Sequence, residues 1–203
     1  MNWSMPRVLP MVAMPGAFDE PITLAEARAH VRVDAAEGES HPDDSKLLSM
    51  VTAARQAAEQ FTERLFTNGT YELLLDELPC IVRFPVAPVG ELLGVQYIGE
   101  DGQPADLAAG IYRLYAHPDQ PGLYSTPGVA MPSLLDMPGA VRVRFKGGHG
   151  PGNPVPRAVV HAMLLTLGHL YDNREEVVTG TTATQLPEGA KALLWPYRRG
   201  LGV

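Results

Sequence analysis

The sequence predicts an α+β protein: a small helical bundle with an inserted, mostly antiparallel β region and a C-terminal helix plus tail. Two changes of period along the 203 residues indicate this class. Apolar residues recur every three or four positions before residue 69 and after residue 154, which is the period of a helix. Between these segments lie short apolar runs bounded by turn residues, as in strands. We therefore expect an N-terminal arm at 1–19, a helical bundle over 20–69 and 154–185, a β-rich insertion at 70–153, and a C-terminal helix and tail at 186–203.

Two helices are predicted in the first 66 residues. The first begins at Thr23-Leu24-Ala25-Glu26, a capping box in which the Thr hydroxyl and the Glu carboxylate each accept from a backbone N–H. It runs to about Val31. The second starts at a cap formed by Asp43 or Asp44 and ends near Phe66. Its apolar positions alternate spacings of four and three, as in the seam of a helix bundle: Leu47, Val51, Ala54, Ala58, Phe61 and Leu65.

The insertion contains short strand candidates separated by turns. They are Tyr71–Leu75, Ile81–Phe84, Gly94–Ile98, Ile111–Leu114 and Val141–Phe145. Glu100-Asp101-Gly102 predicts a hairpin turn, because Gly tolerates a positive φ. The last candidate alternates strictly, so we expect one buried face and one face that carries cations into solvent. Residues 118–138 are rich in Pro and Gly, and they predict a long loop.

The most apolar helix is predicted over Pro154–Val178, where Pro156 suits the first turn. Its apolar stripe is too wide for one neighbour, so we expect it to be buried against at least two. The stripe consists of Val159, Val160, Met163, Leu164, Leu167, Leu170 and Tyr171. A polar linker, Thr179–Thr184, should lead to a last short helix with Pro187 at or near its first position. Pro196 ends that helix and leaves a tail.

Composition limits the classes of protein that this chain can be. Apolar residues make up 45% of it, which is enough for a proper core. The single cysteine, Cys80, excludes an internal disulfide and a Cys-cluster metal site. No run approaches the ~18 apolar residues of a membrane span, so we expect no membrane insertion. Prolines 6, 10 and 15 interrupt the apolar start of the chain, which argues against a signal peptide.

Charge is unevenly distributed along the chain, whose net charge is −7. Residues 1–139 carry 8 basic and 19 acidic side chains, whereas residues 140–203 carry 8 basic and 4 acidic ones. An acidic body argues against tight wrapping of nucleic acid, because that affinity comes mostly from phosphate neutralisation. The basic C-terminal third either faces an acidic partner or is an accident of surface composition, and charge alone leaves both interpretations open.

The sequence offers no persuasive catalytic, cofactor or metal site, and we predict that the protein is not an enzyme. His161 and His169 are too far apart for the chelate that a zincin helix uses. His169 can form a local hydrogen-bonded group with Asp172 and Asn173. A structural or solvent-facing role is the alternative to a functional His–Asp site there. Gly147–Gly152 lacks the Lys-Ser/Thr ending of a phosphate loop, and the prolines after it remove N–H groups that an anion needs. We therefore interpret it as a connection.

Residues near the C-terminus are the best candidates for a binding site. Aromatic residues and arginines of this kind are enriched at interface hot spots. The candidates are Trp195, Tyr197, Arg198 and Arg199. Alternatively, Trp195 packs the last helix onto the core, and both interpretations can hold together.

The order of segments resembles the head–tail connector (adaptor) family of tailed phages, prophages and gene transfer agents. The resemblance extends from about residue 20 to residue 199, and the order and spacing of its segments carry it. In chain order these are ITLAEARAHVRVD, DDSKLLSMVTAARQAAEQFTERLF, VQYIGEDGQ with IYRL, VRVRFKGGHG, VPRAVVHAMLLTLGHLYDNREEVV and LPEGAKALLWPYRR. The start at 1–19 and the loop at 118–138 fall outside the matched pattern.

The resemblance implies a structural protein without cofactors that forms a homo-oligomeric ring, usually twelvefold, under the portal of a filled head. Such a ring extends the DNA channel and offers a docking platform to the next protein, a stopper or tail-completion protein. The implied location is the head–tail junction of a virion assembled in the host cytoplasm. The family's bundle corresponds here to 20–69 and 154–195, and its portal-directed C-terminal segment to roughly Leu186–Val203. Passing duplex DNA should be bound only weakly.

Other classes of function stay open on the sequence alone. A DNA-binding or packaging accessory module of a phage-like element is the alternative if the basic third forms one patch. A small hydrolase would need a convergent His–Asp pocket. A stopper or tail-completion protein is a closer neighbour of the adaptor interpretation.

Overall fold

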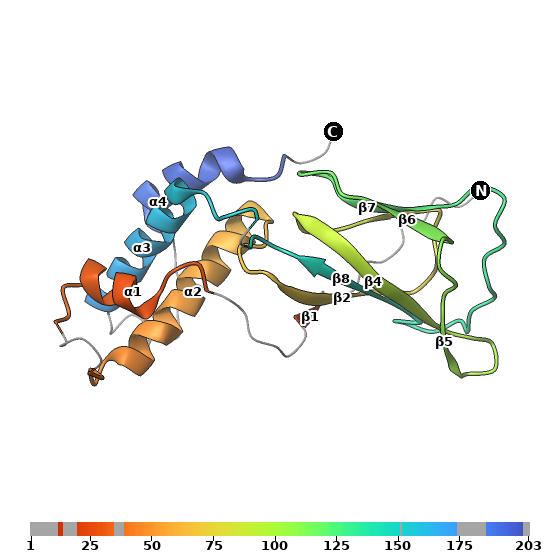
Figure 1. Cartoon of the computed structure of the whole chain (residues 1–203), viewed down its shortest axis with the longest axis horizontal. Helices are drawn as coiled ribbons and strands as arrows, with labels where there is room; N and C mark the ends of the chain where they lie inside the picture. Colours follow the sequence, from red (N-terminus) through yellow and green to blue (C-terminus); the bar gives the residue numbers. More distant parts are fainter. Residues whose placement is uncertain (1–11, 14–19, 35–38, 151, 174–185, 201–203) are drawn as a thin grey trace. The chain divides into compact units, whose positions relative to one another are not determined.

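The computed structural model describes residues 12–13, 20–34, 39–150, 152–173 and 186–200 (Figure 1). The chain divides into two compact units. Residues 1–18 and 68–148 form one, called the β unit below, and residues 19–67 and 149–203 form the other, called the helical unit. Helices together with antiparallel sheets confirm the predicted α+β class. No helix in the described part of the chain has the length and apolar character that crossing a membrane requires.

The helical unit contains four α-helices and a short 3-10 helix among its described residues. They are α1 (Leu24–His30), α2 (Asp44–Thr62), α3 (Arg157–Asp172), α4 (Glu188–Leu194) and η2 (Trp195–Tyr197). The predicted capping box is present, because Glu26 N donates to Thr23 Oγ1 over 3.2 Å and Thr23 N donates to Glu26 Oε2 over 2.9 Å. The hydrogen bonds from Thr23 hold the pKa of the Glu26 carboxyl below its usual value.

Helix α2 begins at a predicted cap residue, Asp43, but ends earlier than predicted. Asp43 occupies the N-cap position, but its carboxylate makes no capping hydrogen bond. It accepts instead from Lys46 and from the hydroxyl of Tyr171 on α3. At the other end the helix stops at Thr62, because Glu63 takes a left-handed conformation with φ of 56°. The last apolar positions before Thr67 therefore lie in a turn that leaves the helix.

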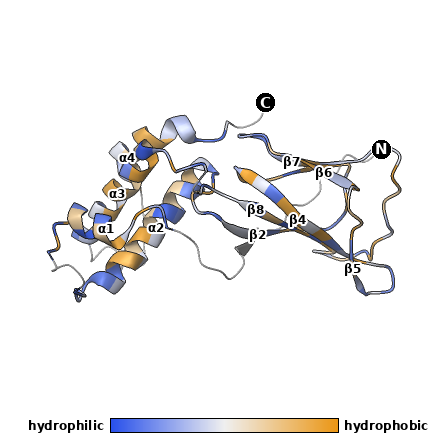
Figure 2. Cartoon of the chain, viewed as in Figure 1, coloured by the Kyte–Doolittle hydropathy of each residue, from blue (hydrophilic) through white to orange (hydrophobic). Residues whose placement is uncertain are grey.

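Helix α3 forms the centre of the helical unit, as its apolar stripe predicts. It packs against α2, α4 and α1 (Figures 1 and 2), so the expectation of at least two neighbours is confirmed. Its fully buried side chains are Val159, Ala162, Met163 and Leu167. Leu164, Leu170 and Tyr171 are only half-buried, because the stripe is wider than the face that the neighbouring helices cover. Buried Ala54 and Ala58 on α2 belong to the same core, where small side chains allow close packing.

The β unit contains two antiparallel sheets. The larger has the strand order β1-β2-β8-β4-β5 and the smaller the order β3-β7-β6. Their bounds are β1 Val12–Ala13, β2 Gly69–Leu75, β3 Ile81–Arg83, β4 Val89–Ile98, β5 Pro104–Asp106, β6 Tyr112–Tyr115, β7 Gly122–Ser125 and β8 Val141–Gly147. Phe84, next to β3, meets Phe145 of β8 with ring centroids 4.7 Å apart, so buried aromatic rings link the two sheets.

Strand β8 confirms the strict alternation that the sequence predicts. Its residues alternate between buried and exposed along the whole strand, with Val141, Val143 and Phe145 inside. The hairpin turn between β4 and β5 is also confirmed. Gly99 N donates to Gln103 O over 2.9 Å, and Gly102 has φ of 75°, which glycine adopts without strain.

Three strands are not predicted from the sequence, and β4 begins five residues earlier than predicted. Strand β1 pairs with β2 within the segment 1–19, and β7 lies inside the segment 118–138. These strands and β5 have four residues or fewer, too short to show a period, so their neighbours in the sheet define them. Strand β4 begins at Val89, where irregular pairing with β8 breaks the alternation that would have marked it.

Shortening Leu167 should test the core of the helical unit. We expect Leu167→Ala to lower the free energy of unfolding by about 2–5 kcal/mol, because it leaves a cavity at a fully buried site. The matched control is Leu164→Ala one turn earlier, which should cost clearly less because Leu164 is half-buried. Chemical denaturation measures both changes, and equal losses would contradict the packing described for α3.

His149 should make the stability of the protein depend on pH. Its ring stacks on Phe66 with centroids 5.7 Å apart, and its Nδ1 lies 3.1 Å from Asn153 O. Burial lowers the pKa of His149 below its usual value of about 6.5. The unfolded chain therefore takes up the proton first. The stability that neutral His149 contributes is fully present above about pH 6.5 and is lost as the pH falls from there through the lowered pKa of the folded chain.

His149→Gln should remove this part of the pH dependence. Between pH 7.5 and pH 5.5, the melting temperature of the wild-type chain should fall further than that of the variant. Parallel thermal melts of the two proteins measure the difference. If both lose stability equally over this range, His149 does not titrate as its burial indicates.

Candidate interaction site at the C-terminal helix

The last helix, α4, is built into the helical unit by one apolar face. Leu186, Ala190 and Leu194 are buried in the core that α3 organises. From the sequence we expect residues 186–203 to form a segment of their own, whereas in the structure α4 belongs to the core of the helical unit. The linker itself, Thr179–Thr184, lies outside the described residues. Removing residues 186–203 would therefore expose part of this core.

The turn after α4 presents an aromatic and cationic cluster. Trp195 begins η2, and its side chain is 63% exposed. The guanidinium of Arg198 lies 5.6 Å from the centroid of the Trp195 ring and 5.7 Å from that of Phe61 at the end of α2. The two rings are 6.3 Å apart. Cation–π attraction in this arrangement orients an exposed indole and a guanidinium side by side.

Tyr197 and Arg199 anchor this cluster through their backbones. The carbonyl of Tyr197 accepts from Arg64 Nε over 2.5 Å, and Arg199 N donates to Thr62 O over 3.0 Å. The structure therefore brings all four predicted residues to the C-terminal end of α2. Trp195 and Arg198 are exposed there, whereas Tyr197 and Arg199 are half-buried.

Phe61 and Arg64 belong to the same cluster but were not singled out from the sequence. Phe61 continues the apolar seam of α2, so its spacing predicted a core residue. Its ring instead packs at the edge of the core, beside Trp195. Arg64 follows the left-handed Glu63, and only that change of direction carries it toward Tyr197. The contacts of Phe61 with Trp195 and of Arg64 with Tyr197 join segments more than 100 residues apart, so the local sequence predicts neither of them.

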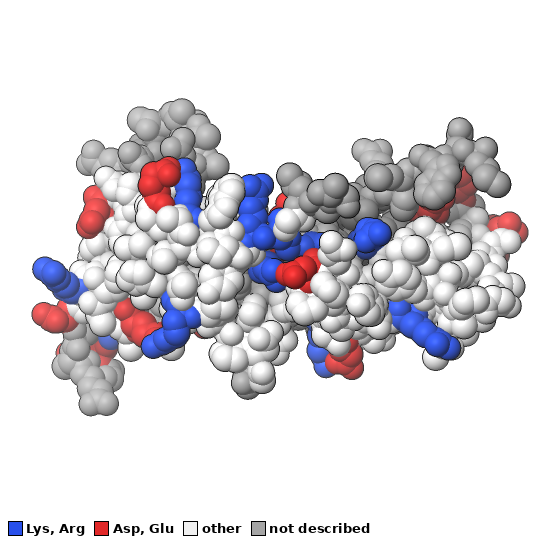
Figure 3. All heavy atoms as spheres, turned by 90° about the horizontal axis from the view of Figure 1, so that it is seen from above, with Lys and Arg blue, Asp and Glu red and all other residues white. Residues whose placement is uncertain are grey.

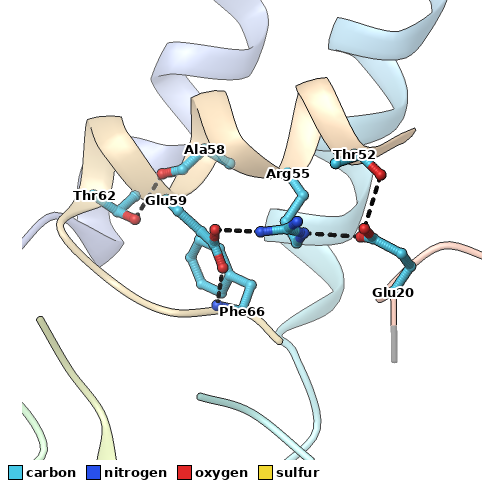
Figure 4. A network of polar contacts seen from close by, with 7 residues as sticks. All are labelled: Glu20, Thr52, Arg55, Ala58, Glu59, Thr62 and Phe66. Carbon is cyan, nitrogen blue, oxygen red and sulfur yellow. Dashed lines mark hydrogen bonds and ion pairs between the residues drawn. The ribbon is translucent and has the colours of Figure 1, made fainter. Parts of the chain in front are cut away.

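A polar network fixes the end of α2 on which the cluster rests (Figure 4). Arg55 Nη1 donates to Glu59 Oε2 over 2.5 Å, and Arg55 Nε donates to Glu20 Oε2 over 2.9 Å. The other oxygen of Glu59 accepts from Phe66 N over 2.8 Å. The side chains of Arg55 and Glu59 are only 12% and 14% exposed. The carboxylate of Glu59 therefore ties the turn at 63–67 back onto its own helix.

Burial raises the pKa of the Glu59 carboxyl above its usual value. Arg55 and the N–H of Phe66 act in the opposite direction, because both stabilise the ionised form. Each oxygen of this carboxylate has a partner, so the group has a structural role that its contacts satisfy. We assign it no chemistry.

Of the possible local group of His169 with Asp172 and Asn173, the structure shows the contact between His169 and Asn173. His169 contacts Asn173, whose Nδ2 lies 3.1 Å from His169 Nδ1, and His161 is exposed. Across the described ranges, no group of three or more His, Cys, Asp or Glu side chains is arranged to hold a metal ion. What the cluster around Trp195 can do is bind a surface: the indole supplies apolar area, and Arg198 supplies donors for a carboxylate.

Comparison with solved structures shows that this fold occurs in gene transfer agent (GTA) particles. The neck of an empty GTA particle, computed with C6 symmetry, contains a chain with 23% identity and a TM-score of 0.77, over 96% of this chain and 98% of that one. The virion of a native GTA particle contains a chain with 22% identity and a TM-score of 0.75, over the same shares. The neck of a native particle, computed with C12 symmetry, gives 23% identity and a TM-score of 0.66, over 93% and 98%.

The fold is thus the fold of a chain found in the neck of GTA particles, and the likeness spans nearly all of both chains. No protein-family model matches the sequence, and no curated protein does so either.

Removing the carboxylate of Glu59 should loosen the end of α2. We expect Glu59→Ala to lower the free energy of unfolding by about 2–4 kcal/mol, because the N–H of Phe66 and one side of Arg55 lose their partner. Glu59→Gln keeps an acceptor oxygen and should cost less. The control is Gln60→Ala, an exposed neighbour that should change stability by about 0.5 kcal/mol or less. If urea denaturation gives equal values for Glu59→Ala and Gln60→Ala, the network does not hold the turn.

Proposed function

We propose that this chain is a structural head–tail connector, an adaptor, of a phage-like particle. One observation carries the proposal: the fold matches a chain of the GTA neck from end to end, including both the helical unit and the β unit. The match covers 96% of this chain and 98% of that chain, at a TM-score of 0.77. The order of segments in the sequence independently resembles the adaptor family.

The proposed assembly is a homo-oligomeric ring, twelvefold as in the adaptor family. The C6 and C12 symmetry of the similar neck structures supports copies arranged around one axis. The ring would lie under the portal, extend the DNA channel, and provide the docking platform for a stopper or tail-completion protein. Its location is the head–tail junction of the virion, after assembly in the host cytoplasm. The role is structural, without catalysis.

Weak contact with passing duplex DNA suits such a channel. The exposed cations of β8 are engaged within the β unit: Arg144 Nε donates to Glu72 Oε2 over 2.9 Å, and Lys146 Nζ lies 2.9 Å from Glu91 Oε2. They therefore do not form a free stripe for phosphates, which weighs against the alternative of a DNA-binding or packaging accessory module. Figure 3 shows mostly uncharged surface on the face that it draws, with basic side chains gathered near the middle and an acidic group among them.

The proposed portal-binding site is the cluster around Trp195. Trp195 and Arg198 would make the contact, and Tyr197 and Arg199 would hold the turn that presents them. An exposed indole beside an arginine is a combination found at interface hot spots. Because the cluster rests on the packed helix α4, it is presented in an ordered form, which lowers the entropic cost of binding.

Loss of the gene from the phage-like element that carries it should leave DNA-filled heads without tails. Supplying the wild-type chain in trans should restore tailed particles, counted by electron microscopy. Trp195→Ala with Arg198→Glu should fold but fail to restore tails, because the contact with the portal is lost. The control is Leu48→Ala, which removes another exposed apolar side chain of the helical unit, 48% exposed on α2, and should restore tails normally.

Two outcomes separate the function from the site. Tailed particles formed without the gene would refute the connector role. Normal tails with the Trp195 and Arg198 variant would refute the assignment of the portal contact and leave the connector role standing. Thermal melts of each purified variant show whether a failure reflects unfolding.

A further inference from the structure

The outer face of the three-stranded sheet carries aromatic and cationic side chains that the proposed portal contact does not use. Strand β7 lies between β3 and β6, and Figure 1 shows β6 and β7 as neighbours. The register of these strands arranges exposed side chains in two rows across the sheet. One row is Ile81, Tyr124 and Arg113, and the other is Arg83 and Tyr115. These five residues are called the Arg–Tyr face below.

The aromatic rings of this face are held in place by their neighbours. The ring of Tyr124 lies over Gly122, where an added Cβ would come within 3.2 Å of the ring. Tyr115 meets Tyr124 edge-on with ring centroids 6.1 Å apart, and it stacks with His117 at 5.7 Å. The Nδ1 atom of His117 accepts from Gln120 N over 3.1 Å, which fixes the ring in its turn. Aromatic side chains that are ordered before contact lose little entropy on binding.

The two arginines give this face its charge. Neither the Arg83 nor the Arg113 guanidinium forms an ion pair or a hydrogen bond with another of the described residues. Strands β3, β6 and β7 contain no Asp or Glu. A guanidinium presents a planar fork of donors that fits a carboxylate in two parallel hydrogen bonds. The outer strands of the sheet therefore offer two sites for carboxylates, with Tyr124 on the strand between them.

The strand register sets the distance between these two sites. Arg83 and Arg113 are two strands and one row apart, which separates their Cα atoms by roughly 12 Å at ordinary strand spacing. In an extended segment, side chains on one side recur every two residues, or about 6.7 Å. Two acidic residues four positions apart therefore match this separation, and the residue midway between them lies over the tyrosines. Ile81, which is 45% exposed, adds apolar area beside them.

We infer that the Arg–Tyr face binds an extended acidic segment of a partner protein. In this segment, two carboxylates four residues apart meet Arg83 and Arg113, and an aromatic or apolar residue between them packs on the tyrosines. The inference rests on the proposed connector role for the place of the partner, which is the protein that docks on the connector. It assigns a surface and a chemistry to that contact.

Charge favours a protein segment over nucleic acid as the occupant of this face. Residues 68–148 contain nine acidic and five basic side chains, so a phosphate chain would approach an acidic unit. Firm binding of nucleic acid requires many phosphate contacts, and this face offers two guanidiniums. A segment with two carboxylates is fully paired by the same two groups. Exposed tyrosines and arginines are also the residue types enriched at the hot spots of protein interfaces.

A peptide titration tests this inference. The probe is a capped peptide with the core Glu-Ser-Tyr-Ser-Glu, and the control peptide has the same composition in the order Glu-Glu-Tyr-Ser-Ser. NMR titration of the amide signals of the full chain at low salt should show tighter binding of the probe, because only its carboxylates match the separation of the arginines. Arg83→Gln or Arg113→Gln should each weaken binding of the probe about tenfold, because each removes one charge-assisted pair.

A matched control checks that net charge alone does not explain the loss. Arg32→Gln with Arg157→Gln makes the same change in net charge as Arg83→Gln with Arg113→Gln, at exposed positions of the helical unit, and should bind as wild type. Equal binding of the two peptides, or binding that survives the change of both face arginines, would overturn the inference. Tighter binding of an oligothymidylate would assign the face to nucleic acid instead. Self-association that the loss of both face arginines abolishes would assign it to a second copy.

Complementation separates this interface from the proposed function. In the element that lacks the gene, the chain with Arg83→Gln and Arg113→Gln should still attach to DNA-filled heads, because the proposed portal contact belongs to the helical unit. Tailed particles should be lost, because the next protein no longer docks. Normal tails, or heads that lack the variant chain, would overturn the inference while the connector role stands. If tails form without any copy of the gene, the connector role itself fails, and the peptide titration alone decides what the face binds.

Discussion

The Glu59 carboxylate holds the arrangement on which the C-terminal cluster depends. One oxygen meets Arg55 and the other accepts from the N–H of Phe66, so helix α2 and the turn that follows it are fixed together. A buried carboxylate is costly unless each oxygen has a partner, and this one has both. Because the turn is fixed, Arg64 reaches the carbonyl of Tyr197, and Arg199 reaches that of Thr62. The position of Trp195 follows from these two contacts.

Helix α4 has one buried face, and the residue that follows it carries an exposed aromatic side chain. Its inner face, with Ala190 and Leu194, belongs to the core, and the next residue, Trp195, is exposed. The sequence left open whether Trp195 anchors the last helix or binds a partner. The structure gives the anchoring role to Leu194 and leaves Trp195 exposed, so binding by Trp195 stays a prediction. A binding surface supported by a core helix keeps its geometry before contact.

In the β unit, buried and exposed residues are likewise neighbours in the chain, because side chains alternate along each strand. Each strand of the smaller sheet places one set of side chains in the core and the other set on the outer face, where Tyr115 and Arg113 stand. Residues that fill the core and residues exposed to solvent therefore alternate along the same strands.

The sequence by itself determined what depends on local order: the capping box at Thr23, the buried stripe of α3, the alternation of β8, and the α+β class. Each repeats a pattern within a few residues, so its physical cause is local. Tertiary structure alone decided the strands β1, β5 and β7, the early end of α2, and the meeting of Phe61, Trp195 and Arg198. These depend on contacts between segments distant in the chain, such as Arg64 with Tyr197. Spacing along a single sequence carries no record of such contacts.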